Sequence, residues 1–165
     1  MNVARVGRTF DPESERYAAR SMNDMSADGS GLEVMTEAEA ISLLATMPVG
    51  RLVYSDRALP FVVPVSFVVD GVDIIIRTGR RSRLATHAPG NIVAFEVDDI
   101  VIASRSGWTV VVTGRVERVD DPVDVARLGA LRLQTWVPHE TDCYLRLRPE
   151  LITGRRIPAV PPVPV

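Results

Sequence analysis

Residues 61–78 read F-V-V-P-V-S-F-V-V-D-G-V-D-I-I-I-R-T, and this stretch decides the fold. Valine, isoleucine and phenylalanine, which favour strands, flank Asp70-Gly71, a dipeptide typical of tight hairpin turns. The pattern predicts a strand over 61–69, a turn, and a returning strand over 72–78. Pro64 cannot donate a backbone hydrogen bond, so we expect an edge, a bulge or an irregular point there. The stretch therefore indicates an antiparallel β-hairpin.

The sequence before this hairpin predicts a helix and another strand. Thr36 and Glu39 have the spacing of a capping box, and apolar residues at helical intervals follow as far as Pro48. Residues 50–55 (G-R-L-V-Y-S) then alternate in the manner of a strand, and 56–60 are expected to form a turn. A short amphipathic helix therefore precedes the first strands.

After the hairpin, strands continue with a short helix between them. Residues 82–87 predict that helix, and 91–97 (N-I-V-A-F-E-V) predict a strand. A loop is expected over 98–107. Residues 108–119 then predict a long strand, in which Gly114 indicates a bend or a close approach of another backbone.

The end of the chain adds one more helix and strand. Asp121-Pro122 predicts a helix start, with the helix continuing to about Leu133. Residues 143–148 (C-Y-L-R-L-R) alternate cleanly, and 151–157 continue the strand after a break at Pro149. Six short strands joined largely by hairpins predict a mainly β fold with peripheral helices. We expect them to close into a barrel, because closure removes exposed strand edges.

Length and charge limit the domain count and the partners. The chain has 165 residues, enough for one hydrophobic core and too few for two ordinary domains. We interpret 1–31 as a flexible N-terminal extension, 32–158 as the folded domain and 159–165 as a Pro-rich tail. A formal net charge of -2 gives no general attraction to nucleic acid or anionic membranes, so neither is expected as a partner.

Several kinds of chemistry are excluded by residues that the sequence lacks. All 19 basic residues are arginines, so no lysine can form a Schiff base. Two histidines and one cysteine offer no metal-ligand spacing, and no metal site is expected. Cys143 is the single cysteine, no apolar run reaches the ~20 residues that span a bilayer, and no secretory signal is expected. These features favour a cytoplasmic location.

One segment points to a family. Residues 74–95 read I-I-I-R-T-G-R-R-S-R-L-A-T-H-A-P-G-N-I-V-A-F. The segment is similar to the flavin-phosphate segment of the pyridoxamine 5′-phosphate oxidase-like split β-barrels, where a strand ends in an aromatic or basic residue plus Thr and Ser-Arg opens a helix. The resemblance implies four phosphate-binding residues: Arg77, Thr78, Ser82 and Arg83.

Elementary chemistry agrees with that assignment. A phosphate favours guanidinium groups and backbone N–H groups at a helix start, and Ser82 adds a hydroxyl. Arg80 and Arg81 are interpreted as added positive potential or as solvated side chains. The alternative for the whole segment is an arginine-rich surface hairpin.

The resemblance covers about 36–157 and implies six further cofactor contacts: Pro64, Val65, Ser66, Trp108, Thr109 and Arg156. The first three would lie beside the flavin ring through their backbone, and the alternative is that they are ordinary barrel residues. Trp108 could instead be a core or dimer-interface side chain. Arg156 would reach the ligand of the partner subunit, or would be a solvated strand end.

The histidines and the second tryptophan are weaker candidates. Trp136 and His139 precede the last strand, where they could line a pocket from the other subunit. His139 is otherwise an exposed side chain. His87, on the short helix, is expected to be structural or solvated.

The resemblance implies a function as well as a fold. Residues 32–158 would be an FMN-binding split-barrel domain, and the chain a flavin-dependent oxidoreductase that forms a homodimer with cofactor sites at the interface. A deazaflavin-dependent reductase of the same superfamily is one alternative, and a non-catalytic flavin- or haem-binding dimeric module is another. Leu84 stands where the oxidase proper often has lysine, so the likeness is to the uncharacterised oxidase-like branch, and the substrate stays open.

Overall fold

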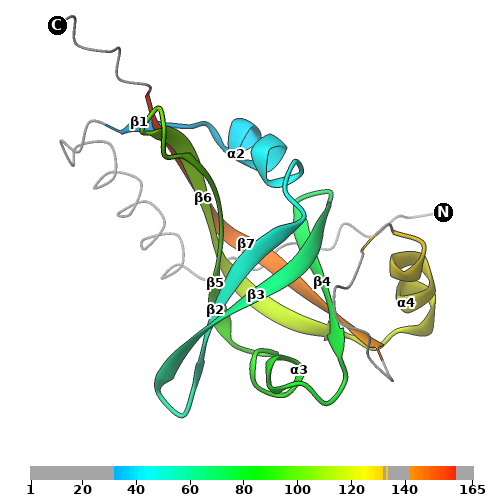
Figure 1. Ribbon diagram of the computed structural model, residues 1–165. Helices are drawn as coiled ribbons and strands as arrows, with labels where there is room; N and C mark the ends of the chain where they lie inside the picture. Colours follow the sequence, from blue (N-terminus) through cyan, green and yellow to red (C-terminus); the bar gives the residue numbers. More distant parts are fainter. Residues whose placement is uncertain (1–31, 132, 134–141, 159–165) are drawn as a thin grey trace, which may run out of the picture. The chain divides into compact units, whose positions relative to one another are not determined.

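The computed structural model describes residues 32–131, 133 and 142–158. Strands dominate this part of the chain, and three short helices lie between them (Figure 1), which confirms a mainly β fold with peripheral helices. The predictions for 1–31, Trp136, His139 and 159–165 lie outside the described residues. The elements in chain order are β1 Glu33–Val34, α2 Glu37–Leu44, β2 Val49–Asp56, β3 Leu59–Asp70, β4 Asp73–Gly79, α3 Arg83–His87, β5 Ile92–Val101, β6 Ser106–Val119, α4 Pro122–Gly129 and β7 Asp142–Ile157.

The strands form a closed ring. The sheet order is β1-β7-β4-β3-β2-β5-β6, and β7 also pairs with β6, which closes the strands β2 to β7 into a ring. Six strands, β2 to β7, therefore make the predicted barrel. β1 is an additional strand that pairs with the end of β7, Glu33 opposite Arg156. A strand of only two residues leaves no periodic pattern, and the sequence did not predict it.

The barrel opens between β3 and β4. These strands pair only near their hairpin turn, from Asp70 opposite Asp73 to Phe67 opposite Ile76. Before Phe67, β3 stays paired with β2, and after Ile76, β4 stays paired with β7. Within the part of the chain that the structure describes, no second strand pairs with the stretch 59–66 of β3, and this open edge makes the closed ring a split barrel.

The free edge explains why Pro64 is tolerated. The register of β2 and β3 runs without a bulge from Val49 opposite Ser66 to Asp56 opposite Leu59. Hydrogen-bonded and non-hydrogen-bonded pairs alternate from the hairpin turn, so Pro64 faces β2 at a non-hydrogen-bonded position. The missing N–H of Pro64 would point toward the split and not toward β2, so no hydrogen bond to β2 is lost. An edge, a bulge and an irregular point were the three predicted alternatives at Pro64, and the edge is the correct one.

The core fills the barrel with side chains from alternate residues. Phe95 is fully buried and meets Phe67 edge-to-face, with ring centroids 4.8 Å apart. Burial of one such ring contributes about 2–3 kcal/mol. Gly50 makes room for Phe95, because a Cβ at that position would lie 2.3 Å from its ring. The large Phe95 side chain thus fills the space that Gly50, which has no side chain, leaves open on the neighbouring strand. Such complementary sizes favour a single packing arrangement of the interior.

Two helices, α2 and α4, pack against the barrel. The predicted capping box of α2 is confirmed: the Thr36 N–H donates to Glu39 Oε2 over 2.9 Å, and the Glu39 N–H donates to Thr36 Oγ1 over 3.3 Å. The Thr36 N–H and the Thr36 hydroxyl both donate to the Glu39 carboxylate, and these two hydrogen bonds lower the pKa of Glu39. α4 packs Leu128 against Ile75 and Tyr144 on the outer side of β4 and β7.

No helix of the described part of the chain is long and apolar enough to cross a membrane.

Four predicted boundaries were wrong. The β2–β3 turn contains only Arg57 and Ala58, because both adopt positive φ, 51° and 64°, and so permit the tightest hairpin. The expected loop 98–107 is largely strand, since β5 and β6 pair as far as Val101 opposite Ser106. α4 ends at Gly129.

The fourth error concerns the last strand. β7 continues through Pro149, opposite a register shift at Gly114 of β6. A Cβ on Gly114 would lie 2.0 Å from the Arg148 carbonyl oxygen, so the predicted close backbone approach is confirmed. The bulge absorbs the proline that would otherwise interrupt the ladder.

Candidate functional site

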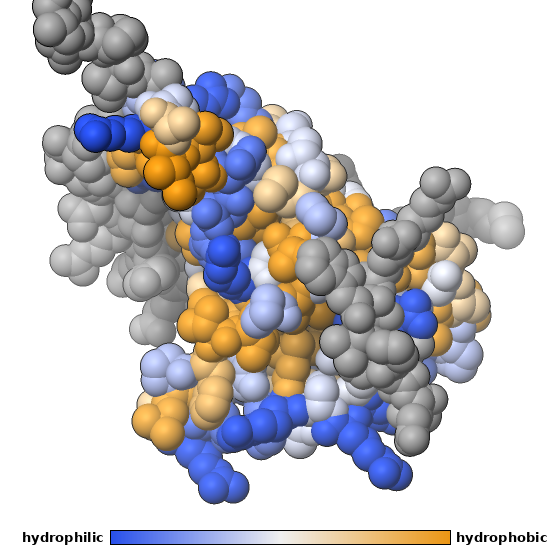
Figure 2. Space-filling view, viewed as in Figure 1, coloured by the Kyte–Doolittle hydropathy of each residue, from blue (hydrophilic) through white to orange (hydrophobic). Residues whose placement is uncertain are grey.

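The candidate site lies at the split, where α3 follows β4. α3 contacts β2 and β4, and it sits at the same end of the barrel as the β2–β3 turn (Figure 1). Figure 2 shows hydrophilic side chains along this end of the molecule. Three structural features meet here: the free edge of β3, the end of β4 and the loop 79–82.

Two hydroxyl groups fix the loop that leads into α3. Ser82 is the N-cap, and its Oγ accepts from the Ala85 N–H over 3.0 Å. The Ser82 and Thr78 hydroxyls are 3.0 Å apart and hydrogen-bonded to each other. Thr78 is buried at the end of β4. A hydroxyl offers one donor and two acceptor sites, so Ser82 keeps one of its three for a ligand. The structure thus joins two of the four predicted phosphate-binding residues.

Arg83 lies at the same place but is already engaged. Its Nη2 donates to Asp56 Oδ2 over 2.9 Å, and its guanidinium carbon lies 4.8 Å above the centre of the Phe61 ring. Asp56 is only 8% exposed, whereas the Arg83 side chain is 66% exposed. The Arg83 guanidinium is therefore held by Asp56 and Phe61, and most of the side chain is exposed. Its other N–H groups are in a position to donate to an anion.

Sequence reasoning missed Asp56 and Phe61 as parts of this site. Asp56 was assigned to a turn, but it ends β2, and its carboxylate points inward like the side chains two and four residues earlier. The alternation of 50–55 extended by one residue would have placed it inside.

His87 supports Asp56 from the other side. The imidazole Nδ1 is 2.8 Å from the Arg83 carbonyl oxygen, and Nε2 is 3.7 Å from Asp56 Oδ1. The prediction of a structural or solvated histidine fits this half-buried position. Among the described residues, no group of three or more side chains of the metal-ligating types was found.

The other arginines of the segment are placed differently. Ile75 packs outward under α4, whereas Ile74 and Ile76 face the barrel interior. By the alternation of a strand, Arg77 points outward and Thr78 inward, so the two lie on opposite faces of β4. Arg80 and Arg81 are exposed in the loop, and no carboxylate pairs with them in the described part of the chain.

The β3 residues present backbone groups to the split. Alternation of the hydrogen-bonded pairs directs the N–H and C=O of Ser66, and the C=O of Pro64, away from β2. Val65 faces the interior and packs against the core. Pro64 and Ser66 therefore supply polar backbone atoms at the edge where a flat aromatic ring could be recognised.

The remaining predicted residues lie at the other end of the barrel. Trp108 packs against the core, whereas Thr109 faces outward and donates to Glu96 Oε1 over 3.1 Å. Glu96 also accepts from Arg51. Arg156 is opposite Trp108 in the β6–β7 ladder and is exposed. One chain therefore carries its predicted cofactor contacts in two groups, one at α3 and one at the start of β6.

The closed ring and the gap between β3 and β4 define a split β-barrel. The loop before α3, which the Thr78 and Ser82 hydroxyls hold in place, lies at this gap. The family model for pyridoxamine 5′-phosphate oxidase matches residues 36–156, which include the whole barrel from the α2 cap to Arg156. The chain therefore belongs to this family.

Relatives support the assignment. A Mycobacterium tuberculosis protein described as uncharacterized, Rv0080, is 39% identical over 126 residues, which are 73% of this chain and 82% of that protein. The FAD-binding protein of Mycobacterium smegmatis is similar in structure with a TM-score of 0.69 and 31% identity, over 75% of this chain and 97% of that one. A FAD-binding protein of Mesorhizobium loti has a TM-score of 0.67 at 22% identity, over 77% and 99% of the two chains, and shows the shared fold.

The residues at the split fit a flavin phosphate and ring. Ser82 and Arg83 offer hydrogen-bonding groups, and Arg80 and Arg81 add positive charge that no carboxylate of the described residues balances. The β3 edge offers backbone atoms of both polarities. A cationic loop beside an open strand edge suits a ligand with an anionic tail and a flat polar head.

Proposed function

We propose that this chain is a flavin-dependent oxidoreductase that binds FMN at the split. The observation that carries the proposal is the juxtaposition of the β3 edge with the loop 79–83, in a chain of the pyridoxamine 5′-phosphate oxidase family. Pro64, Val65 and Ser66 would hold the ring, and Thr78, Ser82 and Arg83 the phosphate. A bound flavin would supply the electron transfer, so the protein needs to supply only binding, orientation and access.

The cofactor site is proposed to be shared by two copies of the chain. Trp108, Thr109 and Arg156 lie at the barrel end opposite to Arg83, so they reach a ligand at the split only in a homodimer. The β5–β6 hairpin also ends in exposed apolar residues: Ile100, Val101 and Ile102 are 44%, 48% and 86% exposed. Figure 2 shows an apolar cluster at that end. Contiguous exposed apolar residues favour a protein interface.

FAD and deazaflavin are the competing cofactors. The Mycobacterium smegmatis protein at 31% identity binds FAD, and FAD carries a second phosphate that the exposed Arg80 and Arg81 could neutralise. The same arginines would suit the longer acidic tail of a deazaflavin. FMN, FAD and deazaflavin differ in their tails, so the loop 79–82 is the place where selectivity among them would arise.

Cofactor binding is tested by titrating the purified protein with FMN, FAD and a deazaflavin and recording the change in the visible absorbance of each cofactor. Saturable binding of FMN, with reduction of the bound flavin by a nicotinamide donor, is the expected result. Preference for FAD or deazaflavin would replace FMN in the proposal. Binding without any reduction would favour a non-catalytic flavin module, and no binding would reject the flavin proposal.

The homodimer is tested by light scattering on the eluted protein. A species of twice the chain's 18.1 kDa is expected. A monomer that binds flavin with full affinity would show that one chain completes the site. In that case Trp108 and Arg156 would have no place in it.

A further inference from the structure

Asp56 is a buried carboxylate that the family resemblance did not single out. It ends β2, is 8% exposed, and meets a cation or potential cation on each oxygen: Arg83 at 2.9 Å and His87 at 3.7 Å. Burying a carboxylate is costly unless it is paired. Its position is therefore tied to α3, the element that carries both partners.

Arg83 is fixed on two sides by residues of the β2–β3 hairpin. Asp56 of β2 accepts one of its N–H groups, and the Phe61 ring of β3 lies 4.8 Å from its guanidinium carbon. An unrestrained arginine side chain has many rotamers and loses them when it binds an anion. Here that loss has already occurred, because two contacts from one hairpin hold the guanidinium before any ligand arrives.

We propose that Asp56 is a positioning residue, which holds the Arg83 guanidinium in place for the phosphate of the flavin. The inference rests on the proposed function, since it assigns Arg83 the phosphate. Asp56 acts only through Arg83 and does not touch the ligand. The β2–β3 hairpin thereby controls the strength of an anion site that lies on a different element.

Positioning and simple electrostatics predict opposite effects. A carboxylate near an anion site repels the anion, so its removal alone would strengthen FMN binding. If Asp56 positions Arg83, its removal weakens FMN binding instead. The sign of the change in dissociation constant therefore separates the two roles.

The experiment compares FMN with riboflavin, which has the same ring and no phosphate. Dissociation constants for both are measured by flavin fluorescence in wild type, Asp56→Asn, Arg83→Gln and the double variant. We expect Asp56→Asn to weaken FMN about tenfold, the scale of the rotamer freedom regained by an arginine, and to leave riboflavin within about twofold. In the Arg83→Gln background, Asp56→Asn should cause no further loss.

Asp70→Asn is the matched control. Asp70 forms an ion pair with Arg127 over 2.8 Å at the other end of β3, and its loss should change neither ligand. If Asp56→Asn does not fold, Phe61→Leu takes its place, because it removes the ring and leaves the carboxylate. It should also weaken FMN selectively.

Three results from the variants would overturn the inference while leaving the proposed function in place. Unchanged or tighter FMN binding in Asp56→Asn would show that the carboxylate only repels. Equal losses for FMN and riboflavin would show a general structural role. A further loss in the Arg83→Gln background would show that Asp56 acts by another route. A wild-type protein that binds neither ligand would reject the proposed function itself, and with it this inference.

Discussion

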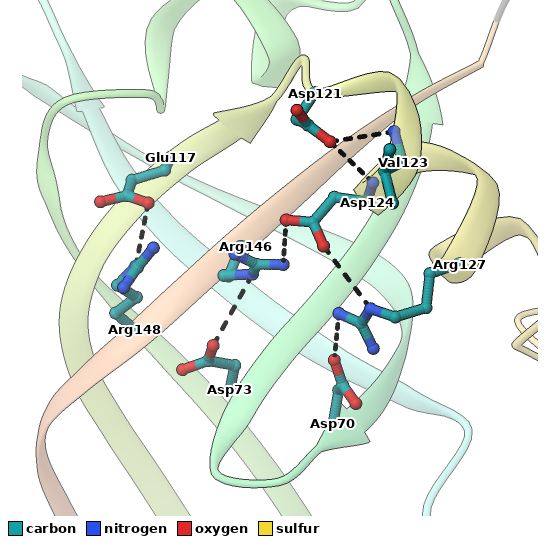
Figure 3. Close-up of polar contacts among 9 residues, drawn as sticks. All are labelled: Asp70, Asp73, Glu117, Asp121, Val123, Asp124, Arg127, Arg146 and Arg148. Carbon is teal, nitrogen blue, oxygen red and sulfur yellow. Dashed lines mark hydrogen bonds and ion pairs between the residues drawn. The ribbon is translucent and has the colours of Figure 1, made fainter. Parts of the chain in front are cut away.

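Arginines gather at two places on this barrel, and carboxylates balance them differently. Around α4, three arginines face four carboxylates: five of these side chains form one chain of ion pairs, and the other two form a separate pair (Figure 3). Arg127 bridges Asp70 and Asp124, Arg146 bridges Asp73 and Asp124, and Arg148 pairs with Glu117. No positive charge is left over for a ligand.

In 80–83, the loop before α3 and the first residue of α3, the arginines outnumber the carboxylates that pair with them in the described part of the chain. Among the described residues, Asp56 is the one carboxylate that pairs with an arginine of 80–83, and of these arginines it contacts only Arg83. Arg80 and Arg81 stay exposed. The comparison teaches that the carboxylates around an arginine cluster determine its role. A matched cluster holds an element in place, and an unmatched one leaves charge that an anion can neutralise.

The largest effect is expected at the matched cluster. Arg146 is 13% exposed, and Arg146→Ala leaves Asp73 and Asp124 without their shared cation. The free energy of unfolding should fall by about 2–3 kcal/mol, less than for a fully buried pair because both carboxylates reach water. Urea unfolding measures it. Arg148→Ala, which breaks an exposed pair, should cost about 0.5 kcal/mol, and a comparable loss in both variants would refute the distinction.

Replacing Arg83 should weaken FMN binding and change the stability little, whereas replacing Arg146 should mainly lower the stability. Arg83→Gln keeps a donor near Asp56 and removes the charge. FMN binding should weaken by about 1.5–3 kcal/mol, the scale of a hydrogen bond to a charged group. Fluorescence titration measures the affinity, and urea unfolding of the same variant should change by less than about 1 kcal/mol. If the Arg83→Gln variant unfolds more easily but binds FMN normally, Arg83 has a structural role like that of the arginines in the matched cluster around α4.

The exposed arginines should act through charge alone. Arg80→Gln and Arg81→Gln should each weaken FMN binding by about 0.5 kcal/mol, with the effect fading at high salt. The double variant should affect FAD more than FMN, since FAD has the additional phosphate. Titrations of both flavins at low and high salt provide the test. A loss that is independent of salt would indicate direct, desolvated contacts instead.

Much of the barrel could be predicted from local patterns. Asp70-Gly71 and its flanking β-branched residues gave the β3–β4 hairpin, and the Thr36–Glu39 spacing gave the α2 cap with both of its hydrogen bonds. These features depend on residues close in sequence. The two-residue strand β1 does not, because it exists only through pairing with β7.

The site was harder to predict for the same reason. Thr78 and Ser82 are four residues apart and were found together, whereas Asp56 and Arg83 are 27 residues apart and meet only in the folded chain. The tight Arg57-Ala58 turn lacks the usual glycine or asparagine, so Asp56 was assigned to a longer turn. Arg77 was predicted beside Thr78, but neighbours in a strand point to opposite faces.

The smallest expected effect is a pH dependence within the matched cluster. Burial raises the pKa of Asp73, against the lowering effect of Arg146 and Arg148. The folded protein therefore binds a proton at Asp73 more readily than the unfolded chain does. The contribution of Asp73 to stability is complete below the ordinary aspartate pKa and declines as pH rises through the raised value.

Asp73→Asn removes this titration. The stability of the variant relative to wild type, from urea unfolding, should therefore be higher at pH about 7 than at pH about 4. The reverse trend would mean that the ion pair with Arg146, 3.6 Å away, outweighs the cost of burial. In that case the α4 network would stabilise the fold through its charges. The expected trend means that its carboxylates are retained to fix the position of α4 at some cost in stability.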